Sequence, residues 1–310
     1  MGEQGVRIGL SAVVIALRDG KACVLTTTGD DGSAALPFGS FDPARDRTFE
    51  LALRAFVTAQ TGFRLGFVEQ LYTFGDLGRA SPRATPGPEH HREVSVGYLA
   101  LTDAADDPSL AEARWTPVLD FFPWEDRREG AAACLTALLD GLRGWADGDA
   151  RRIARIDALF AAAPGQRWNE GQVLERYELL YEARLVAEAW RDADLSPTQP
   201  MPGRIMSSDH RRILATALGR LRSKLKYRPV LFDLTPGVFT LSQLQAGAEA
   251  VSGLSLHKQN FRRGVERTGL VEPTGQLSST TGGRPAELFR FKGVDAQTGA
   301  APGLSLPAQR

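Results

Sequence analysis

The stretch FTLSQLQAGAEAVSGLSLHKQNFRRGVERTG, residues 239–269, decides the fold of the C-terminal third of this 310-residue chain. It contains two segments with apolar residues at helical spacing, and each segment ends at a glycine, Gly253 or Gly269. The turn SGLS between them is short and contains glycine, as a helix-turn-helix requires. An N-capped amphipathic segment, residues 207–227, precedes the pair, and the strand-like stretches LVEPTG and AELFRF follow it. Helices followed by a β-hairpin predict a winged helix-turn-helix.

The start of the second helix, HKQNFRR, has the residue types that read DNA. The second helix of this motif enters the major groove, where Asn and Gln pair with adenine and Arg pairs with guanine. Phe261 and Val265 are four residues apart and are expected to hold the helix on the core. The residues predicted to contact DNA are Lys258, Gln259, Asn260, Arg262 and Arg263 of this helix, Arg284 at the tip of the hairpin, and Lys224 and Lys226 before the motif. The last two would contact phosphates or pair with acidic neighbours.

The net charge of zero hides an uneven distribution of charge along the chain. Residues 204–292 hold fifteen Lys and Arg against six Asp and Glu, so this region is basic by nine and the remainder is acidic by nine. A basic region on an acidic protein is typical of a surface that binds a polyanion, although a solvated cationic face would show the same balance. Double-stranded DNA is the partner that fits both the charge and the motif.

The N-terminal part has the pattern of a mixed sheet with one helix. RIGLSAVVIAL and KACVLTT, joined by Asp19-Gly20 within residues 7–27, predict a β-hairpin. A helix is predicted from the N-cap Thr48 to Gly62, followed by strands at 68–74 and 94–102. This order of strands and helix predicts an α+β domain.

A helical region separates the two ends of the chain. Three segments have apolar residues at three- and four-residue spacing, at 130–146, 150–163 and 172–193. We therefore expect an α+β domain at 1–122, a helical segment with its linker at 123–203, a winged-helix DNA-binding domain at 204–292 and a disordered tail at 293–310.

The composition excludes several classes of protein. Cys23 and Cys134 cannot form a disulfide framework or a metal cage, and each is expected to be a buried thiol. The chain has no run of about 18 apolar residues and no secretory signal pattern at its start. We expect a soluble, cytoplasmic protein with no membrane contact.

The segment LPFGSFDPARDRTFELALRAFVTAQTGF, residues 36–63, resembles the loop–helix element of the Nudix family in its Pro37, Gly39, Arg54 and Gly62. Clustered glutamates of that element hold a divalent cation and its water, because hard cations prefer carboxylate oxygens. Arg54 and Gly62 are one residue too far apart, so two alignments are possible. The glutamate positions hold Ala55, Thr58 and Ala59 in one alignment, and Phe56, Ala59 and Gln60 in the other.

Neither alignment supplies a carboxylate on the helix. Asp46 could stand for the first glutamate of the element, but one carboxylate does not make a metal cluster. We therefore expect no catalytic residues, no metal site, no required cofactor and no hydrolysis. The Nudix-like domain would instead bind an effector.

A nucleotide effector needs arginines for its phosphates and aromatic faces for its rings. The residues predicted to bind it are Arg54, Tyr72, Phe74, Arg79, Arg92 and Tyr98. Core packing is the alternative role for Tyr72 and Phe74. His90 and His91 are adjacent in a polar loop, and we expect them to be solvated rather than to bind a metal.

Both halves together resemble the NrtR family of Nudix-related transcriptional regulators of NAD metabolism. The similarity is carried by LYTFGDLGR (71–79) and VSVGYLALT (94–102), and in the winged part by LRSKLKYRPVLFDLTPGVFTLSQLQ (221–245), NFRR (260–263) and GGRPAELFRF (282–291). The long helical region is similar to that of the extended NadQ-type repressors. The resemblance implies a homodimer that represses NAD biosynthesis genes from a palindromic operator. It also implies modulation by a small nucleotide, with ADP-ribose, NAD or ATP as candidates.

Two other functions fit parts of the sequence. An active Nudix pyrophosphatase acting on ADP-ribose or a related dinucleotide would require Mg²⁺-dependent turnover despite the missing glutamates. A winged helix used to bind protein or RNA would show no preference for DNA.

Overall fold

The computed structural model describes residues 5–66, 68–75, 92–103, 112–278 and 285–293. Four of the features expected from the sequence lie outside the described residues: Arg79, the His90–His91 pair, Arg284 at the hairpin tip and the tail from 294 on. Arg92 belongs to a described strand, but its side chain is not described. Among the described helices none is long and apolar enough to cross a membrane.

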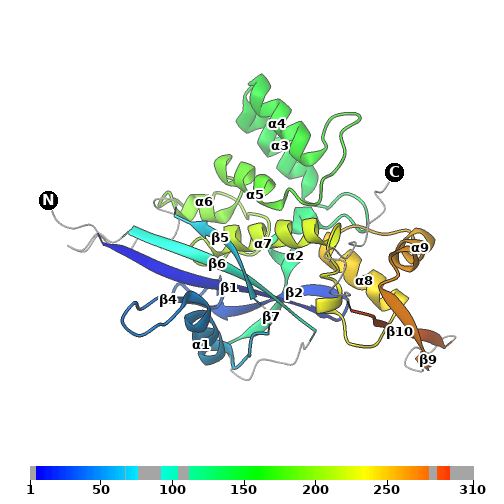
Figure 1. Ribbon diagram of the computed structural model, residues 1–310. Coiled ribbons are helices and arrows are strands. Elements are labelled where there is room, and N and C mark those ends of the chain that lie inside the picture. Colours follow the sequence, from blue (N-terminus) through cyan, green and yellow to red (C-terminus); the bar gives the residue numbers. More distant parts are fainter. Residues whose placement is uncertain (1–4, 67, 76–91, 104–111, 279–284, 294–310) are drawn as a thin grey trace.

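A mixed sheet forms the N-terminal part of the molecule (Figure 1). Strands β1 (Val6–Arg18) and β2 (Lys21–Thr28) form the expected antiparallel hairpin. Its turn residues Asp19 and Gly20 both have positive φ, at 49° and 72°, which matches the right-handed twist of the paired strands. Strand β6 (Arg92–Thr102) runs parallel to β1 along most of its length, and β5 (Val68–Phe74) pairs antiparallel with β6 at the edge.

Short strands complete the sheet. β3 (Ala34–Ala35) and β7 (Arg114–Pro117) both pair with β2, and β4 (Phe38–Ser40) pairs with β1. β4 lies at the start of the segment that resembles the Nudix element, so the sheet fixes the position of that loop.

Helix α1 (Phe49–Thr61) covers one face of the sheet. It starts at the predicted N-cap Thr48, whose side chain accepts a hydrogen bond from the backbone N–H of Leu51, and it ends at Gly62 in the left-handed conformation. Its apolar side, including Leu53 and Val57, is buried against Leu10 and Val96 of the sheet. The helix predicted for this segment is therefore confirmed.

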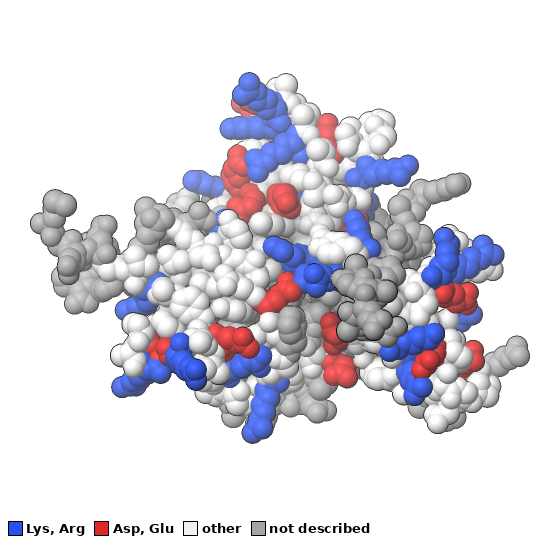
Figure 2. Space-filling model, in the orientation of Figure 1, with Lys and Arg blue, Asp and Glu red and all other residues white. Residues whose placement is uncertain are grey.

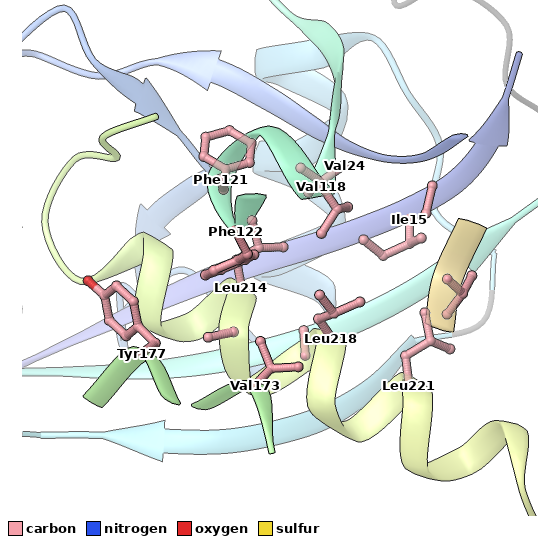
Figure 3. Packing of buried hydrophobic residues seen from close by; sticks show 14 of the residues in the cluster. Ile15, Val24, Val118, Phe121, Phe122, Val173, Tyr177, Leu214, Leu218 and Leu221 are labelled. Atoms are coloured by element: carbon pink, nitrogen blue, oxygen red, sulfur yellow. The ribbon is translucent and has the colours of Figure 1, made fainter. Parts of the chain in front are cut away.

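The opposite face of the sheet is covered by α7 (His210–Leu225). Leu214, Leu218 and Leu221 of this helix pack between the sheet and α5 (Val173–Glu182), as Figure 3 shows with Ile15 and Tyr177. The same helix contacts α8 (Leu241–Ser252) near its C-terminal end. Because α7 has packed neighbours on several sides, its buried residues extend almost all round. The helix expected to open the winged domain thus also completes the sheet domain.

The helical region projects from this face (Figure 1). It contains α2 (Val118–Phe121), the short 3-10 helix η1 (Pro123–Glu125), α3 (Leu135–Ala146), α4 (Ala150–Phe160), α5 and α6 (Ala187–Arg191). The single helix predicted for 172–193 is wrong, because the chain breaks between α5 and α6. Arg184 adopts a left-handed φ of 56° there, and Leu185 packs against the bare backbone of Gly141 in α3. Tertiary packing overrides a continuous helical pattern at this point.

The C-terminal part is a winged helix-turn-helix, as predicted. After the 3-10 helix η2 (Phe232–Leu234) come β8 (Phe239–Thr240), α8, α9 (Lys258–Thr268), β9 (Val271–Ser278) and β10 (Ala286–Phe291), and the strands form a sheet in the order β8-β10-β9. A reciprocal capping box between Thr240 and Gln243 starts α8. The left-handed residues Gly253 and Gly269 end α8 and α9. The overall architecture is α+β with a helical elaboration between the two ends.

The winged helix is packed on the rest of the molecule and shares its core. One continuous apolar cluster runs from Val13 in β1 through Leu218 of α7 to Val265 of α9. Within this contact, Gly247 of α8 faces the side chain of Leu17 in β1, and a Cβ at Gly247 would approach it to 2.7 Å. The position of the helix-turn-helix is therefore tied to the end of the β1–β2 hairpin.

Candidate DNA-binding face and effector cavity

Helix α9 presents one buried and one exposed side. Phe261 and Val265 are 2 % and 0 % exposed and hold the helix on the core, as expected from their spacing. The residues predicted to contact DNA from this helix, Lys258, Gln259, Asn260, Arg262 and Arg263, are all exposed. Figure 2 shows Lys and Arg side chains gathered over α9 at the edge of the molecule. The structure thus brings the five predicted side chains of α9 together on one accessible surface.

The basic side chains of this surface are available to an external partner. No hydrogen bond or ion pair ties Arg262 or Arg263 to the rest of the described residues. An arginine held by a carboxylate would have to break that pair before binding a phosphate or a guanine, and these two have no such pair to break. The α9 surface therefore suits a polyanionic ligand.

A groove runs beside α9 toward the wing. Its volume is about 1330 Å³, and it is lined by Thr240 and Gln243 at the start of α8, by Lys258 and Arg262 of α9, and by Phe289 of β10. The N-terminal N–H groups of a helix carry partial positive charge. The groove thus combines a helix N-terminus and two cationic side chains, which can contact phosphate oxygens, with the two carboxylates of Glu266 and Glu287.

Lys224 and Lys226 are placed differently. Lys224 forms an ion pair with Glu69 of β5, and the Nζ atom of Lys226 lies 2.9 Å from a carboxylate oxygen of Glu170. Lys224 is only 12 % exposed in its side chain. Of the two roles expected for these lysines, the structure shows the pairing with acidic neighbours.

Four of the residues predicted to bind the effector have described side chains, and these four do not form one group. Phe74 packs on the α7 face of the sheet, and the exposed ring of Tyr72 contacts it edge-on at 5.3 Å between centroids. Tyr98 is buried on the opposite face, beneath α1. Arg54 donates hydrogen bonds to the backbone carbonyls of Leu65 and Gly66 and to Glu50. Among the four predicted side chains that are described, Tyr72 and Phe74 are the pair in ring contact, and Arg54 closes the loop that follows α1.

Two positions of α1 that contact the loop at Gly39 hold no carboxylate. The ring of Phe56 lies against Gly39, where a Cβ would approach it to 2.9 Å. The Gln60 side chain donates to the backbone carbonyl of Phe38 and accepts from its N–H, at 2.5 and 3.1 Å. Among the described residues no three His, Cys, Asp or Glu side chains are grouped to hold a metal ion. At these two positions of α1 the side chains therefore offer no carboxylate oxygen to a divalent cation.

A cavity that the sequence analysis missed lies between the sheet and the start of α7. Its volume is about 220 Å³. The floor is formed by alternate residues of β1 and β6, including Ser11 and Ser95, whose hydroxyl groups are 3.2 Å apart. Phe74 pairs in register with Ser95, so the aromatic pair of β5 flanks this cavity. The available signal was the presence of serines at core-facing positions of otherwise apolar strands.

The ionisable side chains that line the cavity are mostly carboxylates. Burial opposes ionisation of Asp31, but hydrogen bonds from Ser207 and Ser33 outweigh this effect and lower its pKa. Burial raises the pKa of Glu93, and the nearby Arg7 counteracts part of that rise. Arg7 is the basic side chain that lines the cavity among its described residues. The cavity is thus better suited to hydroxyl and amide groups than to phosphates.

His210, the first residue of α7, supplies a donor to the cavity. Its Nδ1 accepts a hydrogen bond from the backbone N–H of Leu36 at 3.2 Å, and the edge of its ring meets Phe38. Burial lowers the pKa of His210 to about 4, so the ring is neutral near pH 7. With Nδ1 accepting, the ring proton is on Nε2. His210 lines the cavity and can offer this N–H to a ligand oxygen.

Comparisons with known proteins agree with this arrangement. The family model for the NrtR DNA-binding winged helix domain matches residues 231–291. The chain is 41 % identical over 86 residues to a protein of Acinetobacter baylyi named ADPR responsive transcriptional repressor NtrR. That match covers 28 % of this chain and about a third, 34 %, of the relative.

Two solved structures show the fold of nearly the whole chain. Shewanella oneidensis NrtR, crystallised with a 27mer DNA, has a TM-score of 0.54 at 21 % identity, covering 92 % of this chain and 93 % of the other. A MutT/nudix family protein from Enterococcus faecalis has a TM-score of 0.52 at 16 % identity, with 94 % and 88 % covered. The first part of the chain accordingly has a Nudix-like fold. The resemblance expected from the sequence motifs is confirmed: this chain carries an NrtR-type DNA-binding winged helix on the two-part fold of NrtR.

Proposed function

We propose that this protein is a transcriptional repressor of NAD biosynthesis genes that binds a palindromic operator as a homodimer and responds to a nucleotide. The observation that carries the proposal is the exposed face of α9, whose Arg262 and Arg263 have no partner among the described residues, in a domain that matches the NrtR winged-helix family. Two such helices about one DNA turn apart would read two half-sites, which is why we propose a dimer and a palindrome.

Base contacts and phosphate contacts have different roles in this proposal. Gln259, Asn260, Arg262 and Arg263 would contact base edges in the major groove and supply sequence preference. Lys258 and the start of α8 would hold the phosphate backbone along the groove, and their share of the affinity would depend on salt. Lys224 and Lys226, which pair with Glu69 and Glu170, have no part in this interface.

The test uses the full chain and a duplex that it selects from a random DNA pool. The double variant Arg262→Ala/Arg263→Ala is expected to bind this duplex at least tenfold more weakly at 150 mM salt, because each good base contact is worth about 1–3 kcal/mol. The matched control is Arg143→Ala, which removes an exposed arginine of α3. Equal affinity of the double variant and wild type in fluorescence anisotropy would show that α9 does not read DNA.

The effector in this proposal is a nucleotide bound in the Nudix-like part. The Acinetobacter baylyi relative is named as responsive to ADP-ribose, and we propose ADP-ribose, NAD or ATP as the ligand of this chain. The cavity of about 220 Å³ would hold the sugar or ring portion. Its carboxylates and the Nε2–H of His210 would bind hydroxyl and carbonyl groups, and Phe38 would contact a ring at its rim.

An active pyrophosphatase is the second candidate, since the fold is shared with a MutT/nudix family protein. We favour binding without catalysis, because neither alignment places a carboxylate on α1 and Phe56 and Gln60, glutamate positions in one of them, are packed and hydrogen-bonded. Two measurements with ADP-ribose, NAD and ATP distinguish binding without catalysis from hydrolysis. We expect a rise in melting temperature with one of them and no Mg²⁺-dependent release of its products. Ser95→Val should abolish the rise, whereas Thr102→Val, seven residues along the same strand, should preserve it.

A further inference from the structure

The turn between α8 and α9 rests on a buried charge cluster that comes from other parts of the chain. We call Glu125, Arg176 and Arg222 the Glu125 cluster. Glu125 belongs to η1, Arg176 to α5 and Arg222 to α7, and all three side chains are 0 % exposed. Arg176 donates to both carboxylate oxygens of Glu125 at 2.6 and 2.9 Å, and Nη1 of Arg222 donates to one of them at 2.5 Å.

The cluster holds the C-terminal end of α8. The Nε of Arg222 donates to the backbone carbonyl of Val251 at 2.8 Å. Two residues after Glu125, the backbone N–H of Arg127 donates to the carbonyl of Gly253 at 2.7 Å. The last carbonyls of a helix have no partner within the helix, so outside donors at this end satisfy them and fix where the chain turns. Arg127 and Arg222 both lie outside residues 231–291, the part of the chain that matches the winged-helix family.

Gly253 shows how close this approach is. Its φ of +71° favours glycine on conformational grounds. A Cβ there would also lie 2.3 Å from the carbonyl oxygen of Glu125 and 2.9 Å from Nη2 of Arg222. Gly253, the residue that directly follows α8, is therefore in van der Waals contact with Glu125 and Arg222, without a side chain between them.

We propose that the Glu125 cluster positions the recognition helix α9 for DNA binding, with Glu125 and Arg222 as its positioning residues. The proposal rests on the proposed binding of DNA by α9. Because the turn that leads into α9 is anchored on the cluster, a change in the cluster moves the α9 surface relative to the Nudix-like part. In a dimer that reads two half-sites, such a shift changes the spacing between the two recognition helices. Neither residue touches DNA in this proposal.

The chain offers a matched control for this role. Arg211 and Glu188 form a second buried ion pair, with Nη1 and the carboxylate oxygen 2.9 Å apart and exposures of 0 % and 2 %. Their other hydrogen bonds join the backbone of Phe121, Pro202 and Met206, none of which belongs to the winged helix. Glu188 belongs to α6 and its partner Arg211 to α7, so Glu188→Gln perturbs an equally buried pair that also involves α7 but has no hydrogen bond to α8.

The experiment compares Glu125→Gln with Glu188→Gln in the full chain. The amide of Glu125→Gln places donors against the donors of Arg176 and Arg222, so the end of α8 loses its fixed anchor. We expect at least tenfold weaker binding of the selected duplex for Glu125→Gln and less than twofold for Glu188→Gln. Gly253→Ala, which keeps every charge, should weaken binding like Glu125→Gln because its Cβ displaces the turn.

A second readout does not need DNA. Hydrogen–deuterium exchange of peptides covering residues 241–269 should rise in Glu125→Gln and Gly253→Ala and stay at the wild-type level in Glu188→Gln. Unchanged exchange and unchanged DNA affinity in both cluster variants would overturn the positioning role, as would an equal loss in Glu188→Gln. If the wild type selects no duplex but the exchange pattern appears, the proposed DNA binding fails and the structural anchor stands.

Discussion

The arginines of α9 and the arginines of α5 and α7 have the same chemistry in opposite settings. Arg262 and Arg263 are exposed and have no ion pair to other described residues. Arg176, Arg211 and Arg222 are 0 % exposed, and each donates to a carboxylate and to backbone carbonyls. The first group is arranged for an external anion, whereas the second joins segments of the chain that lie far apart in the sequence.

This difference changes the meaning of the charge asymmetry. The excess of basic residues in 204–292 indicated a surface for a polyanion. Some of these basic side chains instead form ion pairs within the protein. Arg211, Arg222, Lys224 and Lys226 pair with Glu188, Glu125, Glu69 and Glu170, which all lie in the acidic remainder of the chain. An excess of basic residues in one region can therefore serve ion pairs with the rest of the protein as well as contacts with DNA.

The largest expected effect is on stability at the buried arginines. Arg222→Ala should lower the free energy of unfolding by about 3–5 kcal/mol, because it leaves Glu125 with one partner fewer in a fully buried site. Arg262→Ala should change it by less than about 0.5 kcal/mol, since the side chain is exposed. Urea denaturation of both variants checks the contrast. Similar losses in the two would erase the distinction between the groups.

The same contrast between buried and exposed side chains applies to the histidines His210 and His257. Burial lowers the pKa of His210 to about 4, whereas a histidine in an unfolded chain titrates near 6.5. The unfolded state therefore binds more protons between these values, so stability is complete above about pH 6.5 and falls as the pH drops toward 4, by up to about 3 kcal/mol. His210→Gln should flatten this slope, and the exposed His257→Gln should leave it unchanged. Unfolding free energies from pH 4 to 7.5 provide the check.

The smallest effect is expected where a basic side chain is only partly buried. Lys224→Ala removes the ion pair with Glu69 near the end of α7. We expect a loss of less than about 1 kcal/mol in stability and less than a twofold change in DNA affinity. Lys258→Ala, at the start of α9, should weaken DNA binding further and reduce its salt dependence by about one phosphate contact. A larger loss of DNA affinity for Lys224→Ala than for Lys258→Ala would indicate that Lys224 contacts DNA.

The sequence by itself determined the local elements. The β1–β2 hairpin, α1 with its cap and stop, and the helix-turn-helix with its wing all follow from periodicity, turn residues and terminal glycines, which act over a few neighbouring residues. The exposed side of α9 was equally readable, because Phe261 and Val265 fix which face turns inward. The motif resemblance to NrtR followed from the same residues.

The tertiary structure alone decided which polar residues are buried and which segments meet. Ser11 and Ser95 are 84 residues apart and share a cavity floor only because β1 and β6 pair in parallel. Tyr98 lies on the opposite face from Phe74 because side chains alternate along paired strands and a bulge shifts the register of β5. Glu125 meets Arg176 and Arg222 across 51 and 97 residues. Whether a charged side chain is buried depends on packing between distant segments of the chain. The local spacing of residues in the sequence does not reveal this packing.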